Sequence, residues 1–264
     1  MKSGFASILC IFALLFSLDQ VALATDAAAT YPDLVFDDAR YVLTSPSRWK
    51  QQDWQNLGLA TLAVVATAAI VDRPLRDEMN RRSGSSVFMG EVERFGAEYS
   101  LGVLGGFYLA GTAGKNDKAI AVARDGLAAC LITSGIVVPT LKLAFGRSRP
   151  RDNSSINHLK PFSYGNSSFP SGHSAQAFTL ATVIARHYDE SWVGRTAYAT
   201  AGLVGVARSY HGAHYASDIL ASALIGIVIG RSVVEHNQQH RAGTVALVPE
   251  ASPGLVSLSL RGTL

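Results

Sequence analysis

Apolar stretches alternate with charged breaks along most of this chain. Six stretches contain no charged residue and are rich in Ala and Leu, without the strict alternation of a half-buried strand. The pattern therefore predicts six helices, at 57–71, 101–114, 126–141, 174–185, 196–207 and 219–230. Asp125 and Asp218 directly precede the third and last stretches, where an acidic side chain suits the positive start of a helix.

The pattern changes after His236. Val256, Leu258 and Leu260 alternate with polar residues, and 249–254 supplies turn-forming residues before them. The fold class expected is all-α, a bundle of about six core helices with a small C-terminal β-hairpin or extended tail. The expected divisions are a signal peptide (1–24), a polar N-terminal segment (25–55), a helical domain (56–236) and the tail (237–264).

The first residues have the features of a secretory signal. Lys2 precedes a short apolar stretch, and Ala22-Leu23-Ala24 supplies a small-residue cleavage site. We therefore expect an exported, periplasmic or extracytoplasmic protein, with an uncleaved anchor as the alternative. The longest of the six apolar stretches, 126–141, is shorter than the roughly 20 residues of a membrane span. The sequence thus slightly favours a helical domain that packs on itself or rests against a membrane. The close alternative is an integral membrane protein.

Composition excludes some classes of protein. The chain is 48% hydrophobic and 16% charged, and its net charge of +3 is too small and scattered for nucleic-acid binding. Cleavage of the signal would leave Cys130 alone, so no internal disulfide is expected. Oligomeric state is left open.

Three short clusters in the C-terminal half carry the chemistry, and the first is basic. Lys142 and Arg149 lie two helical turns apart, so a continuous helix would place them on one face, with Arg147 and Arg151 beside them. The planar guanidinium of Arg can donate two hydrogen bonds to a phosphate, and the ammonium of Lys adds a point charge beside its oxygens. The alternative is a solvated basic helix end.

The second cluster is Pro170-Ser171-Gly172-His173, just before an apolar stretch. Ser171 and Gly172 could open a helix whose N–H groups face an anion. His173 beside that anion could donate a proton to a leaving alcohol. The alternative is an ordinary helix cap with a nearby histidine.

The third cluster holds Arg208, His214 and Asp218. The spacing of four residues lets Asp218 orient His214, so that one ring nitrogen can attack phosphorus and form a phosphohistidine. Arg208 would be a third cation on the phosphoryl oxygens. The alternative is a His–Asp pair that caps a helix.

A metal centre built from His173, His211, His214 and Asp218 is disfavoured, because several cations would converge on the same place and repel a divalent ion. No metal and no cofactor are therefore expected. The remaining histidines are interpreted as ordinary loop or surface residues: His158, His187, His236 and His240.

In order and spacing, the clusters resemble the signature of the type 2 phosphatidic acid phosphatase and vanadium haloperoxidase superfamily. That signature has Lys, six residues and Arg-Pro; then Pro-Ser-Gly-His; then Ser-Arg, five residues, His, three residues and Asp. The matching residues are Lys142, Arg149, Pro150, Pro170, Ser171, Gly172, His173, Arg208, His214 and Asp218. One departure is Ala207, where the family usually has Ser.

The resemblance implies an all-helical fold with the site at one end of a bundle and metal-independent phosphoester hydrolysis through phosphohistidine. It makes His214 the nucleophile, His173 the general acid and Asp218 the group that orients His214. It assigns phosphate binding to Lys142, Arg149, Ser171, Gly172 and Arg208. The expected substrate is a lipid phosphate, such as phosphatidate or phosphatidylglycerophosphate, or a polyprenyl diphosphate. Alternatives are a nonspecific soluble acid phosphatase, a vanadate-dependent haloperoxidase and a non-catalytic helical protein.

Overall fold

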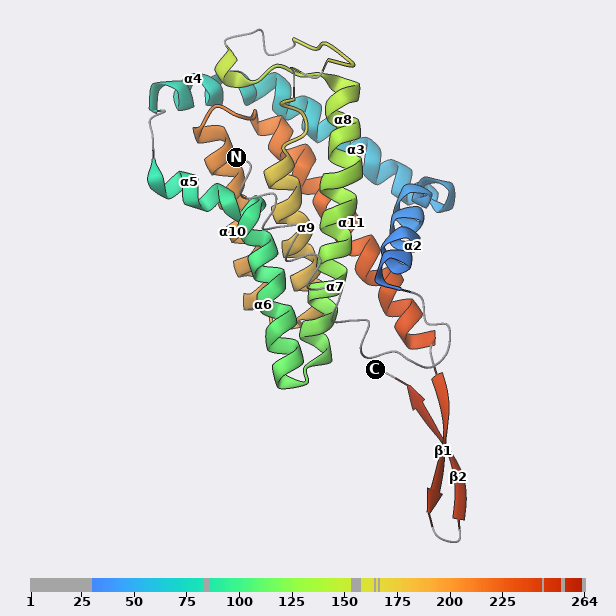
Figure 1. Ribbon diagram of the computed structural model, residues 1–264. Coiled ribbons are helices and arrows are strands. Elements are labelled where there is room, and N and C mark those ends of the chain that lie inside the picture. The colour runs from blue at the N-terminus through green and yellow to red at the C-terminus, as the bar shows by residue number, and fades with distance from the viewer. Residues whose placement is uncertain are drawn as a thin grey trace.

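Helices form the body of the protein in the computed structural model (Figure 1). The structure describes residues 30–82, 86–152, 158–163, 165, 167–243, 245–252 and 255–262, so the expected signal at 1–24 lies outside the described residues. The helices are α2 (Tyr31–Leu43), α3 (Gln51–Ile70), α4 (Asp72–Arg82), α5 (Val87–Glu93), α6 (Glu98–Gly114), α7 (Asp117–Leu131), α8 (Val138–Phe145), α9 (Gly172–His187), α10 (Ser191–Tyr210) and α11 (Ala216–Gly243). The expectation of an all-α fold is confirmed.

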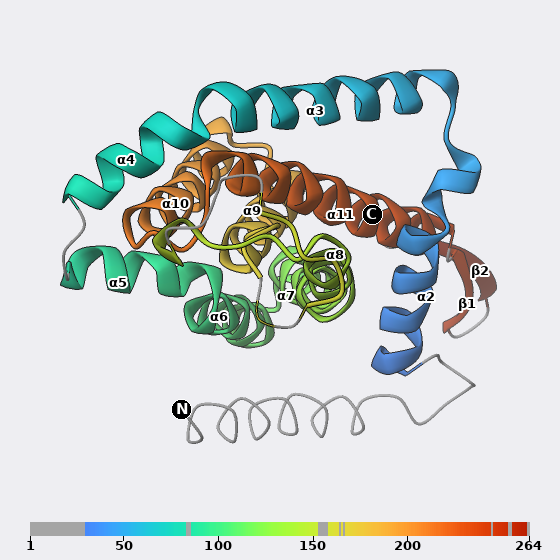
Figure 2. The same ribbon diagram turned by 90° about the horizontal axis from the view of Figure 1, so that it is seen from above.

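Helix α9 lies at the centre, surrounded by α6, α7, α10 and α11 when the bundle is seen from above (Figure 2). Two glycines bring α11 close to it. A Cβ at Gly226 would lie 2.6 Å from the carbonyl oxygen of Ala175, and one at Gly230 would lie 2.8 Å from that of Thr179. Because no larger residue fits there, these positions fix how closely the two helices approach.

The helix expected at 126–141 is longer than its apolar stretch. Helix α7 begins at Asp117, where the Asn116 side chain accepts a hydrogen bond from the Ala119 N–H. It continues through a π-helical stretch, Ile132–Val137, into α8. Pro139 explains this stretch, since proline lacks an N–H and crowds the preceding turn. Asp125 consequently lies inside α7, buried, and the expectation that it opens a helix is wrong.

The two ends of the chain add elements outside the six apolar stretches. Helix α2 comes from the polar N-terminal segment and contributes Ala39 and Val42 to the same core cluster as Val183 and Val233. Beyond α11, strands β1 (Val245–Ser252) and β2 (Leu255–Gly262) pair antiparallel, with Ser252 opposite Leu255. Figure 1 shows this hairpin pointing away from the bundle.

The outer surface is apolar enough to meet a membrane. Among the residues that the structure describes, two helical segments, Asp117–Phe145 and Ala216–Arg241, have the length and hydropathy of a span, and α3 with α4, bent by 54°, forms a third candidate. Leu59, Leu62 and Leu109 are each about two-thirds exposed. The expectation that the helices are too short to span a membrane is therefore wrong for these segments, because the continuous helices extend well beyond the apolar stretches.

Candidate active site

The three sequence clusters meet at one end of the bundle, where the loop between α8 and α9 crosses the top of Figure 1. Cluster one begins in the last turn of α8 and continues beyond it, cluster two begins α9, and cluster three joins α10 to α11. Segments far apart in the sequence therefore contribute to a single place.

The first cluster reaches the site by a different route from the one expected. Helix α8 ends at Phe145, because Gly146 adopts a left-handed conformation with a φ of 54°. Arg149 is thus not on the helix that carries Lys142, and the expectation of one continuous helix is wrong. The two side chains still converge. Lys142 Nζ donates to the Ser167 carbonyl, and Arg149 Nη2 donates to Ser167 Oγ at 2.9 Å.

His214 is held by the next residue of the same loop. Its Nδ1 lies 2.6 Å from the Ser168 carbonyl oxygen, and its side chain is almost fully buried. A carbonyl can only accept, so Nδ1 must carry the proton. The lone pair of the ring is therefore on Nε2, as a nucleophile requires.

Asp218 lies near His214 but is not within hydrogen-bond distance of it. The distance from His214 Nδ1 to Asp218 Oδ2 is 3.8 Å, longer than a hydrogen bond. Asp218 instead accepts from Ser168 Oγ at 2.6 Å and from the Tyr215 N–H at 2.9 Å. The expected direct Asp218–His214 bond is thus replaced by an indirect one, in which Asp218 fixes the residue that fixes His214.

A buried network behind Asp218 has no counterpart in the sequence patterns. Arg147 Nη1 donates to Asp218 Oδ1 at 2.6 Å and to Ser217 Oγ at 2.7 Å, while its Nη2 donates to Asp72 Oδ2 at 2.8 Å. All four residues are buried. Arg147 was noted only as a flanking cation, and Asp72 carries no local signal because it is 75 residues away from its partner.

The second cluster opens α9 as expected. Ser171 is the N-cap of α9. Its hydroxyl accepts a hydrogen bond from the Ser174 N–H at 3.4 Å and donates one to Ser174 Oγ at 3.0 Å. The hydroxyl therefore serves the helix, and the part of the cluster that offers donors outward is the backbone at Gly172 and His173.

Arg208 of the third cluster pairs with a carboxylate that the sequence did not reveal. Glu93 Oε2 lies 2.6 Å from Arg208 Nη1 and 2.9 Å from His211 Nδ1. Burial raises the pKa of Glu93, but its bonds to His211 and Arg208 outweigh this and hold that pKa below its ordinary value. Within the part of the chain that the structure describes, Arg208 Nε is buried and has no hydrogen-bond partner.

Both histidines of the site favour the neutral form. Burial lowers the pKa of His173 from 6.5 to about 4, with Arg208 as the next cause. Burial also lowers the pKa of His214 to about 4, and Asp218 opposes this shift only partly. A bound phosphate would raise both values, because its negative charge favours the imidazolium.

These pKa values predict an acid-sensitive fold. Between about pH 4 and 6.5 the unfolded chain binds more protons at His173 and His214 than the folded protein does, so stability falls as the pH falls through this window. Thermal unfolding measured across the window should show this decline, and His173→Gln should make it shallower. An unchanged slope in His173→Gln would contradict the assignment.

Two of the histidines interpreted as ordinary surface or loop residues are paired with carboxylates, and of these His236 is buried and His187 is partly buried. His187 Nε2 lies 2.9 Å from Asp125 Oδ2, and His236 Nδ1 lies 2.9 Å from Asp38 Oδ1. That part of the interpretation is wrong. Helix periodicity could have indicated it for His236, which follows the buried Val233 by three residues, or about one turn.

Parts of the chain are similar in sequence to known proteins. The family model described as PAP2 superfamily matches residues 126–241. A lipid A 1-phosphatase from Porphyromonas gingivalis is 36% identical over 98 residues, which cover 36% of this chain and 20% of that protein. The chain thus matches about a fifth of the length of this curated relative.

Two solved structures are also similar. The crystal structure of Aquifex aeolicus LpxE has a TM-score of 0.48 and 26% identity, covering 62% of this chain and 95% of that one. A PAP2-type phosphatidylglycerolphosphate phosphatase from Bacillus subtilis has a TM-score of 0.42 and 18% identity, covering 81% of this chain and 98% of that one. The residues matched by the family model contain all three clusters, from Lys142 to Asp218.

Proposed function

We propose that this protein is a metal-independent phosphatase that hydrolyses a lipid phosphate or polyprenyl diphosphate through a phosphohistidine. The observation that carries the proposal is the fixed tautomer of His214, whose proton lies on the nitrogen facing the Ser168 carbonyl. Its Nε2 is thereby a base within electrostatic reach of Lys142 and Arg208. The similarity to a lipid A 1-phosphatase supports a phosphorylated lipid as the substrate class.

The cations provide the binding energy for the phosphoryl group. Lys142 and Arg149 meet at Ser167, and Arg208 offers a buried Nε–H that no described residue accepts. An oxyanion is an acceptor that suits such a charged donor. These fixed charges would stabilise the additional negative charge that develops on the equatorial oxygens during transfer.

The chemistry then follows from the two imidazoles. His214 Nε2 attacks phosphorus, the bond from phosphorus to the ester oxygen breaks, and His173 gives its proton to that oxygen as the alcohol leaves. Water next attacks the phosphorus of the phosphohistidine and gives a proton to His173. The bond from phosphorus to His214 Nε2 breaks, so phosphate is released and both rings return to their starting states. His173 must be protonated in the first step, so the incoming phosphate has to reverse the low pKa that this residue has in the protein alone.

An apolar groove beside the site favours a lipid. It has a volume of about 570 Å³ and lies between α3, α8 and α11. Its walls include Val64, Phe145 and Leu224, and its inner end includes Arg147 and Ser217, which belong to the buried network around Asp218. We propose that it accepts the hydrocarbon part of the substrate. We also propose that residues 1–24 direct export and that the site faces the extracytoplasmic side.

Phosphate release from a lipid phosphate in mixed micelles and from p-nitrophenyl phosphate, both in the presence of a chelator, tests the proposal. We expect strong preference for the lipid and no loss in chelator. Thr61→Trp, which fills the groove from an exposed position on α3, should raise KM for the lipid while leaving the soluble ester unaffected.

Leu62→Trp is the matched control, since Leu62 is on the same helix but does not contribute to the groove. A large preference for the soluble ester would favour a nonspecific acid phosphatase. Inactivation by chelator while the protein remains folded would contradict metal-independent chemistry. Equal effects of Thr61→Trp and Leu62→Trp on the KM for the lipid would contradict binding of the hydrocarbon part in the groove.

A further inference from the structure

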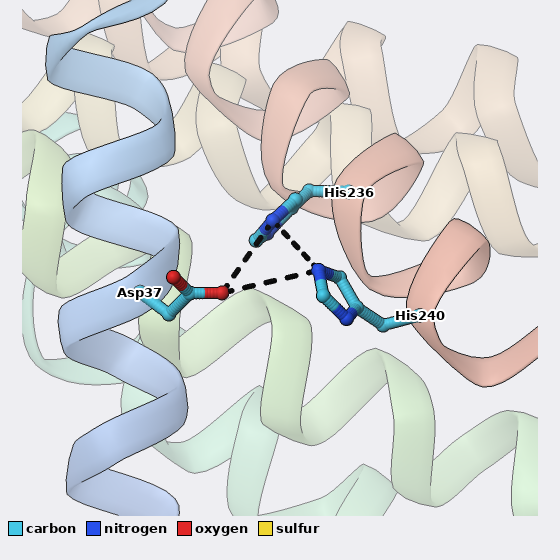
Figure 3. Close-up of side chains that lie close together, drawn as sticks. All are labelled: Asp37, His236 and His240. Carbon is cyan, nitrogen blue, oxygen red and sulfur yellow. Dashed lines mark hydrogen bonds and ion pairs between the residues drawn. The ribbon is translucent and has the colours of Figure 1, made fainter. Parts of the chain in front are cut away.

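A second cluster of chemically capable side chains lies where α2 meets the C-terminal half of α11, away from the loop that carries the candidate active site (Figure 1, Figure 3). Asp37 comes from α2, and His236 and His240 lie four residues apart on α11. Figure 3 shows the carboxylate of Asp37 and both imidazoles pointing toward a common point.

The spacing of the three ligand atoms suits a metal ion. His236 Nε2 and His240 Nε2 are 3.0 Å apart, and Asp37 Oδ2 lies 3.6 Å from the first and 3.9 Å from the second. Tetrahedral ligands about 2.0–2.1 Å from zinc are about 3.3 Å from one another. The observed separations bracket that value, so small side-chain rotations would close the site.

His236 is already oriented for ligation. Its Nδ1 lies 2.9 Å from the buried carboxylate of Asp38, and its ring stacks on Tyr41 with centroids 4.1 Å apart. A carboxylate accepts, so Nδ1 is the protonated nitrogen and Nε2 presents its lone pair toward His240 and Asp37. A carboxylate behind a histidine is the usual outer support of a metal ligand.

Asp38 is fixed in turn. Its other oxygen accepts from Asn237 Nδ2 at 3.1 Å, and Asn237 also contacts Asp125 at 3.1 Å. An ion could still enter from solvent, because the side chains of Asp37 and His240 are 55% and 65% exposed. The cluster therefore combines a rigid, buried ligand with two accessible ones.

We propose that Asp37, His236 and His240 bind a divalent transition-metal ion, for which zinc is the best match. Two imidazoles and one carboxylate are ligands that zinc accepts, with water completing the coordination. The ion would join α2 to α11. The competing explanation is a plain hydrogen bond, in which His240 Nε2–H donates to His236 Nε2 at the same 3.0 Å. The proposal does not depend on the phosphatase proposal.

Zinc titration of the full chain, purified without a polyhistidine tag, tests the proposal by calorimetry. We expect one equivalent to bind and to raise the unfolding temperature, and Co²⁺ to give visible absorption that zinc displaces. Asp37→Asn, an isosteric change at an exposed position, should abolish this binding. Asp38→Asn should weaken it by about 10–100-fold.

His158→Ala is the matched control, since it removes a histidine from the loop at the other end of the bundle and should leave zinc binding unchanged. Absence of stoichiometric binding in the wild type would overturn the proposal and leave the hydrogen-bonded pair. Wild-type affinity in Asp37→Asn would overturn it as well, because the metal would then be bound elsewhere.

Discussion

A His214→Ala variant is expected to lose phosphate release by more than about a thousandfold, because the change removes the nitrogen that we propose attacks phosphorus, and water alone must then do so. The hydrogen bond from His214 Nδ1 to the Ser168 carbonyl fixes the tautomer of His214, so that Nε2 carries the lone pair. Steady-state hydrolysis of the preferred lipid phosphate measures the loss.

Vanadate binding provides the control for that variant. The cations of Lys142, Arg149 and Arg208 remain in place, so the oxyanion should still bind. Retained binding with lost turnover separates chemistry from folding. Activity within about tenfold of the wild type would contradict nucleophilic attack by His214.

Arg147→Met is expected to destabilise the protein by about 3–5 kcal/mol, the usual cost of removing one partner from a buried ion pair. The change leaves Asp72 and Asp218 buried without their shared counter-charge. Activity should fall too, since Asp218 holds Ser168 and thereby His214. Denaturant unfolding in detergent measures the first effect, and phosphate release at low temperature measures the second.

Arg151→Met is the matched control, because Arg151 is an exposed arginine of the same loop and its loss should change stability by no more than about 0.5 kcal/mol. Adding Asp72→Asn to Arg147→Met should recover part of the loss, because one uncompensated charge is removed. Equal stabilities of the Arg147 and Arg151 variants would contradict the importance of the buried network.

Local patterns were sufficient to predict the helical class and the residues of the three clusters. Uncharged stretches mark helices because a buried helix excludes charge. The same rule failed at the ends of those stretches. Asp125 interrupts the apolar pattern yet lies inside α7, since His187 and Arg241 from other helices pair with it there.

The supports of the site could not be predicted, because they act across long separations in sequence. Glu93 meets Arg208 from 115 residues away, and Asp72 meets Ser217 from 145 residues away. A lone carboxylate in a charged break has no local pattern that distinguishes it from a solvated one. The position of Arg149 was also beyond local reasoning, because Gly146 ended the helix that the spacing of the cluster suggested.

The dipeptide Ser167–Ser168 has a wider consequence. Two of its five hydrogen bonds, those from Lys142 and His214, are accepted by main-chain oxygens that every amino acid possesses. Related enzymes could therefore have other amino acids at these two positions and keep the hydrogen bonds to the lysine and the histidine, provided the path of the backbone is conserved. Searches that compare only residue identity would overlook this part of the machinery, whereas superposed chain traces would reveal it.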